Sequence, residues 1–532
     1  MTKGVKITLW VVGALVTLFV ALFLSADIIA SRFVKKEVAK TFVNMPGAEA
    51  SIGGVYLDLL SGSAIVKDIA FSTPNLAVKV PTLEVWNIRY LELIKERRVV
   101  IWKVSVDDAV LRVNLDEKNP AALLPEFPKD TTLEKAPLWL QSIEIQSFDI
   151  ERFCAQLQSV HTPLRVEIDT FSLATQDWKY SFADSVLQYN DSCYELDLRA
   201  LRMKTPDGLF ALELHDLEQE DQGALSLGYT HFINTIDPKL LADRKKEPTA
   251  WIEMELNRLS TSAFNPLRKV MAKDYTLDRL QVDVKRLHVH QDNRYPPKVP
   301  YSTPQDFLRK LPVSFCVNRI KATVRKADIE LATTETNCGE LHAHNIHADL
   351  ANITNRRGAT WYNHAKAPFG EKGQVEASYT IHMDKKASFE IQMNVQDVET
   401  EDLNGFIRPL IGITSQCHID QLETHYKGDR NSVRGEFCMQ YHGLDVRVHK
   451  EDKIPYEIVT KNADVFTNLA NTLVPKSNPT TVDPAPRRYY VEWKRDEWKP
   501  YPLYLFGPCI DGVKKTMLPG LYVHKQVKGS GS

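Results

Sequence analysis

The residues in this sequence with the clearest potential for chemistry are closely spaced histidines. His288 and His290 are separated by one residue, and the segment 342–347 carries three histidines with the first two spaced in the same way. On a β-strand, side chains two residues apart point to the same face, so each pair could supply half of a zinc site. The residues between the paired histidines are apolar. We therefore place the histidines on the solvent side of a sheet and predict no metal site and no cofactor.

Motifs of the common enzyme classes are absent from the sequence. It contains no phosphate-binding loop GxxxxGK[ST] and no GxGxxG, GxSxG or HExxH pattern. Its carboxylates have the context of solvated strand charges, and a hydrolase would require clustered polar residues on an inward face, which the sequence does not show. We predict no catalytic residues and a protein that is not an enzyme.

The dominant pattern is alternation of apolar and polar residues, typical of strands with one buried face. Turn-like breaks at 206–208, 427–429 and 442–443 separate the alternating runs. The pattern predicts a mainly β chain with a long, curled antiparallel sheet of roughly twenty strands at about 4.8 Å spacing. Few short helices are expected, at Leu91–Arg97, Thr303–Lys310, Leu403–Ile411 and Val465–Leu473.

The N-terminus has the character of a membrane anchor. Residues 7–26 contain no charge, and twenty helical residues reach about 30 Å, the thickness of a bilayer's hydrocarbon core. A cleaved signal peptide would have a shorter apolar core, so we predict a cytoplasmic tail and uncleaved transmembrane signal anchor over 1–26. An amphipathic helical extension follows over 27–48, with Phe33 and Phe42 on its apolar stripe.

The seven cysteines lack CxxC spacing. Cys417 and Cys438 would not lie opposite each other in a hairpin that turns near Gly428–Asn431, so a disulfide between them is not expected. We interpret the cysteines mainly as small core residues.

The apolar face of so large a sheet needs a partner. The sequence supplies few amphipathic helices to cover it, so the sheet must curl on itself, form a sandwich, or hold an apolar ligand. The same question, what covers the apolar face, applies to the first hairpin, "VYLDLLSGSAIVKDIAF" (55–71), which follows the predicted anchor in the sequence. We expect Val55, Leu57 and Leu59 to seal the end of the sheet against the helix Phe33–Phe42.

Several segments in this order resemble the AsmA-like family. They are "GVYLDLLSGSAIVKDIAF" (54–71), "IRYLELIKERRVVIWKVSVDDAVLRV" (88–113), "LPVSFCVNRIKATVRKADIEL" (311–331), "GELHAHNIHADLANITN" (339–355), "VRGEFCMQYHGLDVRVHKED" (433–452) and the C-terminal "YYVEWKRDEWKPYPLYLFGPCIDGVKKTMLPG" (489–520). The resemblance, to members from Bacteroidetes-type bacteria, implies a single-pass bacterial inner-membrane protein. Residues 49–488 would form a periplasmic β-groove domain, and 489–532 a C-terminal segment with a flexible tail. The chain is much shorter than the family's bridging members.

The resemblance further implies an open hydrophobic groove that binds phospholipid or another acyl lipid and supports outer-membrane homeostasis. From the strand pattern alone, the same apolar faces could be closed protein core. The candidate lining residues are Leu196, Leu198, Phe210, Leu212, Leu214, Ile252, Met254, Leu256, Val375, Tyr379, Ile381, Met383, Phe389, Ile391, Met393, Val395, Phe437 and Met439.

An alternative function is a non-enzymatic assembly factor that holds an outer-membrane protein or envelope complex by strand addition at a sheet edge. The ordinary composition, with 25% charged residues and a net charge of -2, argues against nucleic acid as a partner.

Overall fold

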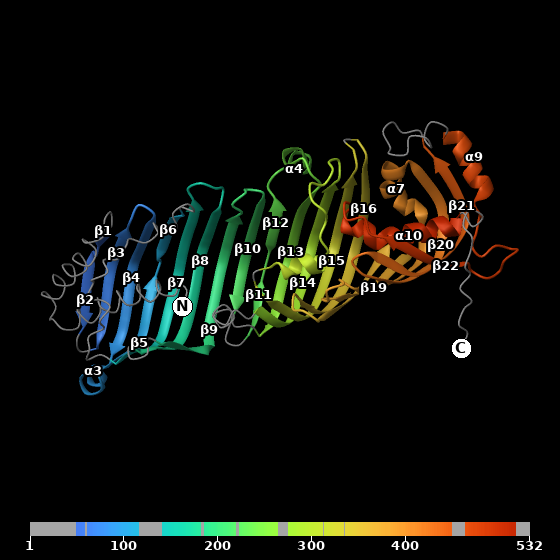
Figure 1. Ribbon diagram of the computed structural model, residues 1–532. Helices are drawn as coiled ribbons and strands as arrows, with labels where there is room; N and C mark the ends of the chain where they lie inside the picture. The colour runs from blue at the N-terminus through green and yellow to red at the C-terminus, as the bar shows by residue number, and fades with distance from the viewer. Residues whose placement is uncertain are drawn as a thin grey trace, which may run out of the picture. The chain divides into compact units, whose positions relative to one another are not determined.

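The computed structural model describes residues 49–58, 61–115, 141–181, 186–219, 223–263, 275–311, 313–334, 336–449 and 463–517. The chain divides into two compact units, Met1–Gly228 (the first unit) and Tyr229–Ser532 (the second unit). Strands dominate both units, and the helices are short (Figure 1). The prediction of a mainly β chain with few helices is confirmed.

The first unit is a mainly antiparallel sheet. Its strands follow the order β1/β2, β3, β4, β5/β6, β7, β8, β9, β10, β11, in which β1 and β2 both pair with β3, and β5 and β6 both pair with β4 and β7. The bounds are β1 Glu49–Ser51, β2 Gly54–Asp58, β3 Ser63–Ser72, β4 Leu76–Ile88, β5 Arg98–Asp107, β6 Val110–Leu115, β7 Ser142–Ser159, β8 Arg165–Ser181, β9 Val186–Lys204, β10 Phe210–Gln219 and β11 Ala224–Leu227, with the helix α3 at Tyr90–Glu96.

The predicted first hairpin is present. Val55 lies opposite Val66, and the turn uses Gly62 at a φ of 68°, a conformation that favours glycine. Val55 packs against a buried cluster that includes Val66, Leu83 and Ile101. The predicted seal against the helix Phe33–Phe42 stays a prediction, because that helix, Leu59 and the side chain of Leu57 lie outside the described residues.

The second unit is also a sheet, in which each strand from β12 to β22 pairs with the next strand along the chain. The strands are β12 Thr230–Asn234, β13 Thr249–Ala263, β14 Tyr275–Asp292, β15 Phe315–Ala332, β16 Cys338–Thr354, β17 Thr360–Phe369, β18 Gly373–His382, β19 Phe389–Glu399, β20 Ile413–Gly428, β21 Ser432–Val448 and β22 Arg488–Lys494. The helices are α4 Pro238–Lys245, α6 Pro304–Arg309, the 3-10 helix η3 Thr400–Leu403, α7 Asn404–Ile411, α9 Ala463–Leu473 and α10 Tyr501–Met517.

The prediction of a wholly antiparallel sheet is wrong in one place in each unit. β5 and β6 run parallel to β7, and β14 runs parallel to β15. A parallel pair requires a long return connection, here 116–141 and 293–314. These connections replace the short hairpin turns found elsewhere. Their Pro-rich sequences do not indicate whether the next strand runs parallel or antiparallel to its neighbour.

Four predicted helices are confirmed, as α3, α6, α7 and α9, whereas α4 and α10 were not predicted. The predicted turn at 206–208 is confirmed, and the turn predicted at 427–429 lies at 429–431, because β20 continues to Gly428. The predicted break at 442–443 is wrong, because both residues lie inside β21, where Gly443 has a φ of 72°. This glycine permits a local irregularity within the strand and does not end it.

In long strands, the alternation of apolar and polar residues shifts by one position at a single residue, which is called a phase switch here. The apolar residues before and after that residue stay on the same face. In β16, Leu341 and Ala343 are half-buried and so are Ile346 and Ala348, although the spacing between the two pairs is odd. Asn345 lies between them, exposed, with a φ of 49°. The positive φ, which Asn tolerates better than most residues, lets the alternation restart one residue later. Positive φ values also occur within other strands, at Asp68, Arg152 and Asp397, and again in β16 at Asn352.

Within the described residues, no helix is long and apolar enough to cross a membrane. The predicted anchor at 1–26 and the amphipathic extension at 27–48 fall outside those residues.

The six described cysteines are free thiols, and Cys316, Cys417 and Cys438 are buried. Cys438 lies opposite Glu423, so Cys417 and Cys438 are not cross-strand neighbours, as predicted.

Candidate functional site

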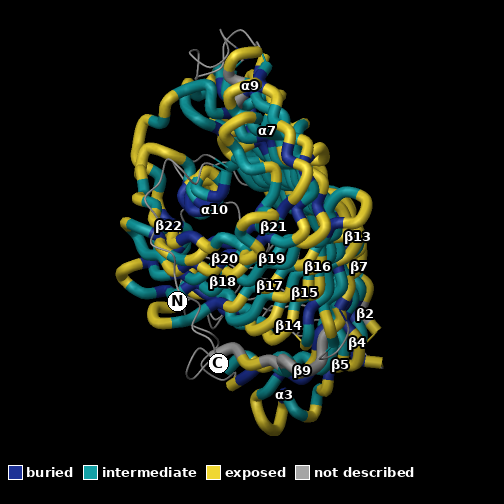
Figure 2. Tube along the Cα trace, turned by 90° about the vertical axis from the view of Figure 1, so that its right-hand side faces the viewer, coloured by how far each residue is buried: buried dark blue, intermediate teal, exposed yellow. Residues whose placement is uncertain are grey.

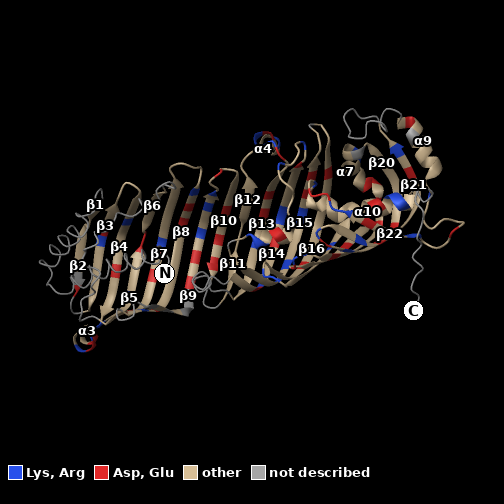
Figure 3. Ribbon diagram, in the orientation of Figure 1, with Lys and Arg blue, Asp and Glu red and all other residues tan. Residues whose placement is uncertain are grey.

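The strands β13 to β16 of the second unit have one charged face. Charges of opposite sign lie on adjacent strands of this face (Figure 3). The cross-strand ion pairs are Lys285–Glu255 at 2.7 Å, Arg325–Asp283 at 2.7 Å, Arg286–Asp328 at 3.5 Å and His342–Asp328 at 2.8 Å. Pairing of this kind leaves little net charge on the face, and it identifies the opposite face as the apolar one.

The opposite face carries rows of apolar side chains in register. Ile252 lies opposite Val289, Val289 opposite Ile329, and Ile329 opposite Leu341. A second row joins Met254, Leu287, Ala327 and Ala343 in the same way. Ile329 is 37% exposed, and its row neighbours are neither fully buried nor fully exposed. We call these two rows the open apolar face.

Farther along the second unit, α10 packs on the apolar side of β19 to β22. Its residues Tyr501 and Tyr504 belong to the same buried cluster as Phe389, Phe437 and Met439. Two glycines allow the close approach: a Cβ at Gly507 would lie 2.4 Å from Trp493, and one at Gly512 would lie 2.2 Å from Phe437. At this end of the unit the apolar face is therefore closed by the chain itself.

The underside of α10 is held by tyrosines. Tyr426 donates a hydrogen bond to the Sγ of Cys509 at 3.5 Å, and Tyr504 donates to the carbonyl oxygen of Asp429 at 2.9 Å. Burial raises the pKa of Tyr426, and burial also raises the pKa of Tyr441 to about 12. These phenols remain neutral donors in a packed environment.

The other side of α10 is apolar and exposed. Leu503, Phe506 and Ile510 are 41%, 56% and 43% exposed, at the three- and four-residue spacing of one helical stripe. Figure 2 shows the mixture of buried and exposed positions along this helix. The helix thus buries one side against the sheet and presents a second apolar surface within the same unit.

The first unit also carries apolar rows in register. Leu196 on β9 lies opposite Leu173 on β8, and Leu198 lies opposite both Phe171 and Leu217. Phe153 and Phe171 form an edge-to-face pair with ring centroids 6.3 Å apart. In this unit the predicted residues Leu196, Phe210, Leu212 and Leu214 are half-buried and Leu198 is buried.

In the second unit, the predicted lining residues fall into two groups. Half-buried positions are Ile252, Met254, Val375, Tyr379, Ile391, Met393 and Val395, whereas buried positions are Leu256, Ile381, Met383, Phe389, Phe437 and Met439. Only Ile252 and Met254 belong to the open apolar face, because Tyr379, Ile391, Met393 and Val395 pack against the cluster under α10.

The sequence placed Val289, Leu341 and Ala343 on the apolar side, but of the open apolar face only Ile252 and Met254 were predicted as lining residues. Leu287, Val289, Ile329 and Leu341 alternate with polar residues, but Lys285 with Arg286 and Arg325 with Lys326 interrupt the alternation at phase switches. Allowing one shift of phase per strand would have recovered these positions.

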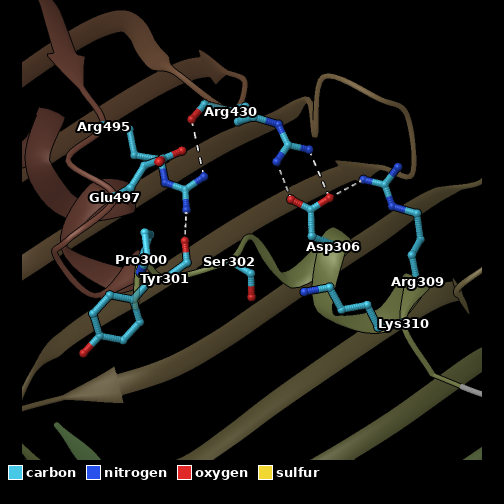
Figure 4. Close-up of a pocket in the computed structure, with 9 residues that line it drawn as sticks. All are labelled: Pro300, Tyr301, Ser302, Asp306, Arg309, Lys310, Arg430, Arg495 and Glu497. Atoms are coloured by element: carbon cyan, nitrogen blue, oxygen red, sulfur yellow. Dashed lines mark hydrogen bonds and ion pairs between the residues drawn. The ribbon is translucent and has the colours of Figure 1, made fainter. Parts of the chain in front are cut away.

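A connection between β14 and β15, residues 293–311, reaches elements far along the chain; we call it the strap. Asp306 on α6 accepts hydrogen bonds from Arg430, at the β20–β21 turn, and from Arg309 (Figure 4). The amide of Tyr301 donates to the carbonyl oxygen of Glu497 at 2.7 Å, and Arg495 donates to the carbonyl oxygen of Tyr301. Leu308 packs beside the buried Trp361, Ile381 and Met383.

A polar cavity of about 450 Å³ lies along these contacts. It is lined by Pro300, Tyr301, Ser302, Asp306, Arg309, Lys310, Arg430, Arg495 and Glu497 (Figure 4). Because Arg430 and Arg495 are both occupied in holding the strap, we interpret the cavity as part of the joint that fixes the strap.

The predicted location of the histidines is half right. His342 is exposed, with 65% of its side chain accessible, but only 16% of His288 and 7% of His290 is accessible. His288 and His290 therefore lie on the predicted face, opposite Val289, but they are shielded from solvent there. Trp251, whose indole donates to the carbonyl oxygen of Ile236 at 2.8 Å, lies edge-on to His288 and shields this part of the charged face.

Comparison of the sequence with known protein families and with curated proteins gives no match.

Proposed function

We propose that this protein is a non-enzymatic, membrane-anchored lipid-binding protein of the AsmA-like type, which holds acyl chains on the apolar faces of its sheets. The observation that carries the proposal is the open apolar face of the second unit. A charged and ion-paired face lies behind it, and its apolar residues are exposed at Ile329 and half-buried at the other positions except Ala327, which is buried. The resemblance to the AsmA-like family supports a periplasmic location and phospholipid as the ligand.

The energetics fit an acyl chain. Exposing two chains with about 30 methylenes to water costs on the order of 25 kcal/mol, at about 0.8 kcal/mol per methylene. A continuous apolar surface removes most of this cost without directional contacts, so the ligand can slide between equivalent positions. Such a surface needs no catalytic residue, and it would let phospholipid move toward the outer membrane.

The helix α10 supplies a further surface for the same ligand. Its exposed stripe of Leu503, Phe506 and Ile510 is unusual for a helix whose other side is packed on a sheet, because large exposed apolar groups cost solubility. A ligand with flexible aliphatic chains would cover such a stripe without the shape matching that a protein partner requires.

The test is site-specific photo-crosslinking in the full chain. A photoreactive amino acid at Ile329, on the open apolar face, is expected to form an adduct with phospholipid that mass spectrometry detects. The matched control is Gln281, an exposed residue of β14. Absence of a lipid adduct at both Ile329 and Met254 in folded protein would overturn the proposal, and protein adducts in place of lipid would favour the assembly-factor alternative.

A further inference from the structure

A group of metal-ligating side chains, of which His290 is buried and the other two are half-buried, lies on the charged face at the ends of three adjacent strands. His290 is near the end of β14, Glu330 near the end of β15, and Cys338 begins β16. One donor atom from each residue lies within 4.8 Å of the donor atoms of the other two. Their backbone positions are fixed by the strand pairing, so the cluster does not depend on a flexible loop.

The histidine of this cluster has an unsatisfied nitrogen. Nδ1 of His290 bonds a carboxylate oxygen of Glu330 at 2.7 Å, whereas its Nε2 is buried and has no hydrogen-bond partner. His290 is only 6% exposed. An ion shared with Glu330 would bind Nδ1, the nitrogen that faces this carboxylate, in place of the present hydrogen bond. The imidazole proton would then lie on Nε2.

The second oxygen of Glu330 is also engaged. It bonds Nε2 of His288 at 2.8 Å, so one carboxylate orients two imidazoles. When an ion replaces the bond to His290, the bond to His288 still orients the Glu330 carboxylate. Burial alone would raise the pKa of Glu330, but the hydrogen bonds from His290 and His288 outweigh it and hold the pKa below its ordinary value.

The thiol of Cys338 is in a negative environment. Burial, with the charges of Glu330 and Glu340, raises its pKa to about 11 against the opposing charge of Lys239 on α4. A thiol in such a place is protonated at neutral pH and is a poor nucleophile. A divalent cation would reverse this, because metal binding displaces the thiol proton and offsets the nearby carboxylates.

We propose that His290, Glu330 and Cys338 bind a divalent transition-metal ion, with Zn²⁺ the best match to a nitrogen, oxygen and sulfur donor set. The ion would tie β14, β15 and β16 together. It lies on the face opposite the open apolar face, so this role is independent of lipid binding.

A second group, His231, Glu253 and Glu255, also has donor atoms within 4.8 Å. There the carboxylates already have cationic partners, since Glu255 pairs with Lys285 at 2.7 Å and Glu253 with Arg286 at 3.8 Å. We therefore do not assign an ion to that group, and it serves as a matched control.

The test uses the full chain, purified in detergent, stripped with a chelator and titrated with Zn²⁺ and with Co²⁺. We expect one tightly bound ion per chain and a thiolate-to-Co²⁺ charge-transfer absorption. Cys338→Ser should abolish this absorption, and His290→Gln should weaken binding at least tenfold. His231→Gln and Cys316→Ser should change neither.

A readout without substitutions guards against misfolded variants. In the unmodified protein, Zn²⁺ should slow alkylation of Cys338 at least tenfold, followed by peptide mass spectrometry, while Cys154 in the first unit reacts at an unchanged rate. The proposal is overturned if the stripped protein binds no ion, or if Zn²⁺ binds without protecting Cys338.

Discussion

A charged residue on the open apolar face should separate ligand binding from folding. Ile329 is 37% exposed, so Ile329→Glu removes roughly two thirds of the burial of one isoleucine. At about 1.5–3 kcal/mol for full burial, the expected cost is about 1–2 kcal/mol of unfolding free energy. The new carboxylate keeps access to water and avoids the larger penalty of a buried charge.

The contrast is Phe437→Glu, because Phe437 is 1% exposed under α10. That substitution loses the whole aromatic side chain from a core and buries a charge, so we expect more than about 4 kcal/mol and unfolding of the second unit. The matched control for Ile329→Glu is Gln281→Glu, an exposed change that adds the same charge to β14.

The assays are urea unfolding followed by circular dichroism, and binding of a fluorescent phospholipid to the full chain. We expect Ile329→Glu to remain folded and to lose at least tenfold in lipid affinity, with Gln281→Glu unchanged in both. If Ile329→Glu unfolds as readily as Phe437→Glu, the face is sealed core. If it is folded and binds lipid normally, the ligand lies elsewhere.

Three further changes test the framework around this face. Gly512→Leu should loosen the packing of α10, because its Cβ would lie 2.2 Å from Phe437. We expect a loss of about 1–3 kcal/mol of unfolding free energy and faster proteolysis of α10. Gly405→Ala, whose Cβ would lie 3.5 Å from its nearest contact, should change neither. Asp306→Asn should weaken the strap by about 1–2 kcal/mol at pH 7. The hydrogen bond from Arg430 outweighs burial and lowers the pKa of Asp306 from 3.8. This stabilisation is therefore complete above pH 3.8 and is lost as the pH falls through the lowered pKa. The urea midpoints of wild type and variant should converge in acid and differ at neutral pH. Asn345→Val should cost about 1–2 kcal/mol because a branched residue resists the positive φ, but Asn345→Gly should be neutral within error in the same unfolding assay.

The local pattern of this chain is readable from its sequence. Alternation in segments such as 375–383 and 389–395 predicts the strands β18 and β19, and the turn at 427–429 predicts the β20–β21 hairpin. These features depend on residues close together in the chain, so their signals are local.

Features set by distant contacts were not predicted. The helix α10 contains Pro508, Gly507 and Gly512, which disfavour a helix in isolation; its stability comes from packing on Trp493 and Phe437. His290 belongs to a strand pattern that suggests an exposed side chain, but α4, an eight-residue helix that was not predicted, packs against β13 and β14. The open apolar face was only partly predicted, because phase switches such as Asn345 break strict alternation.

The strap has a consequence for the order in which the second unit is made. Most of its sheet grows by hairpins, so each new strand can pair with the previous one as the chain emerges. The strap differs, because its partners lie far along the chain. Asp306 can bond Arg430 only after another 124 residues have been made, and Tyr301 can bond Arg495 only after another 194. During synthesis the strap therefore gains these contacts in steps, first with Arg430 and later with Arg495, and a chain truncated before Arg495 lacks the contact between Tyr301 and Arg495.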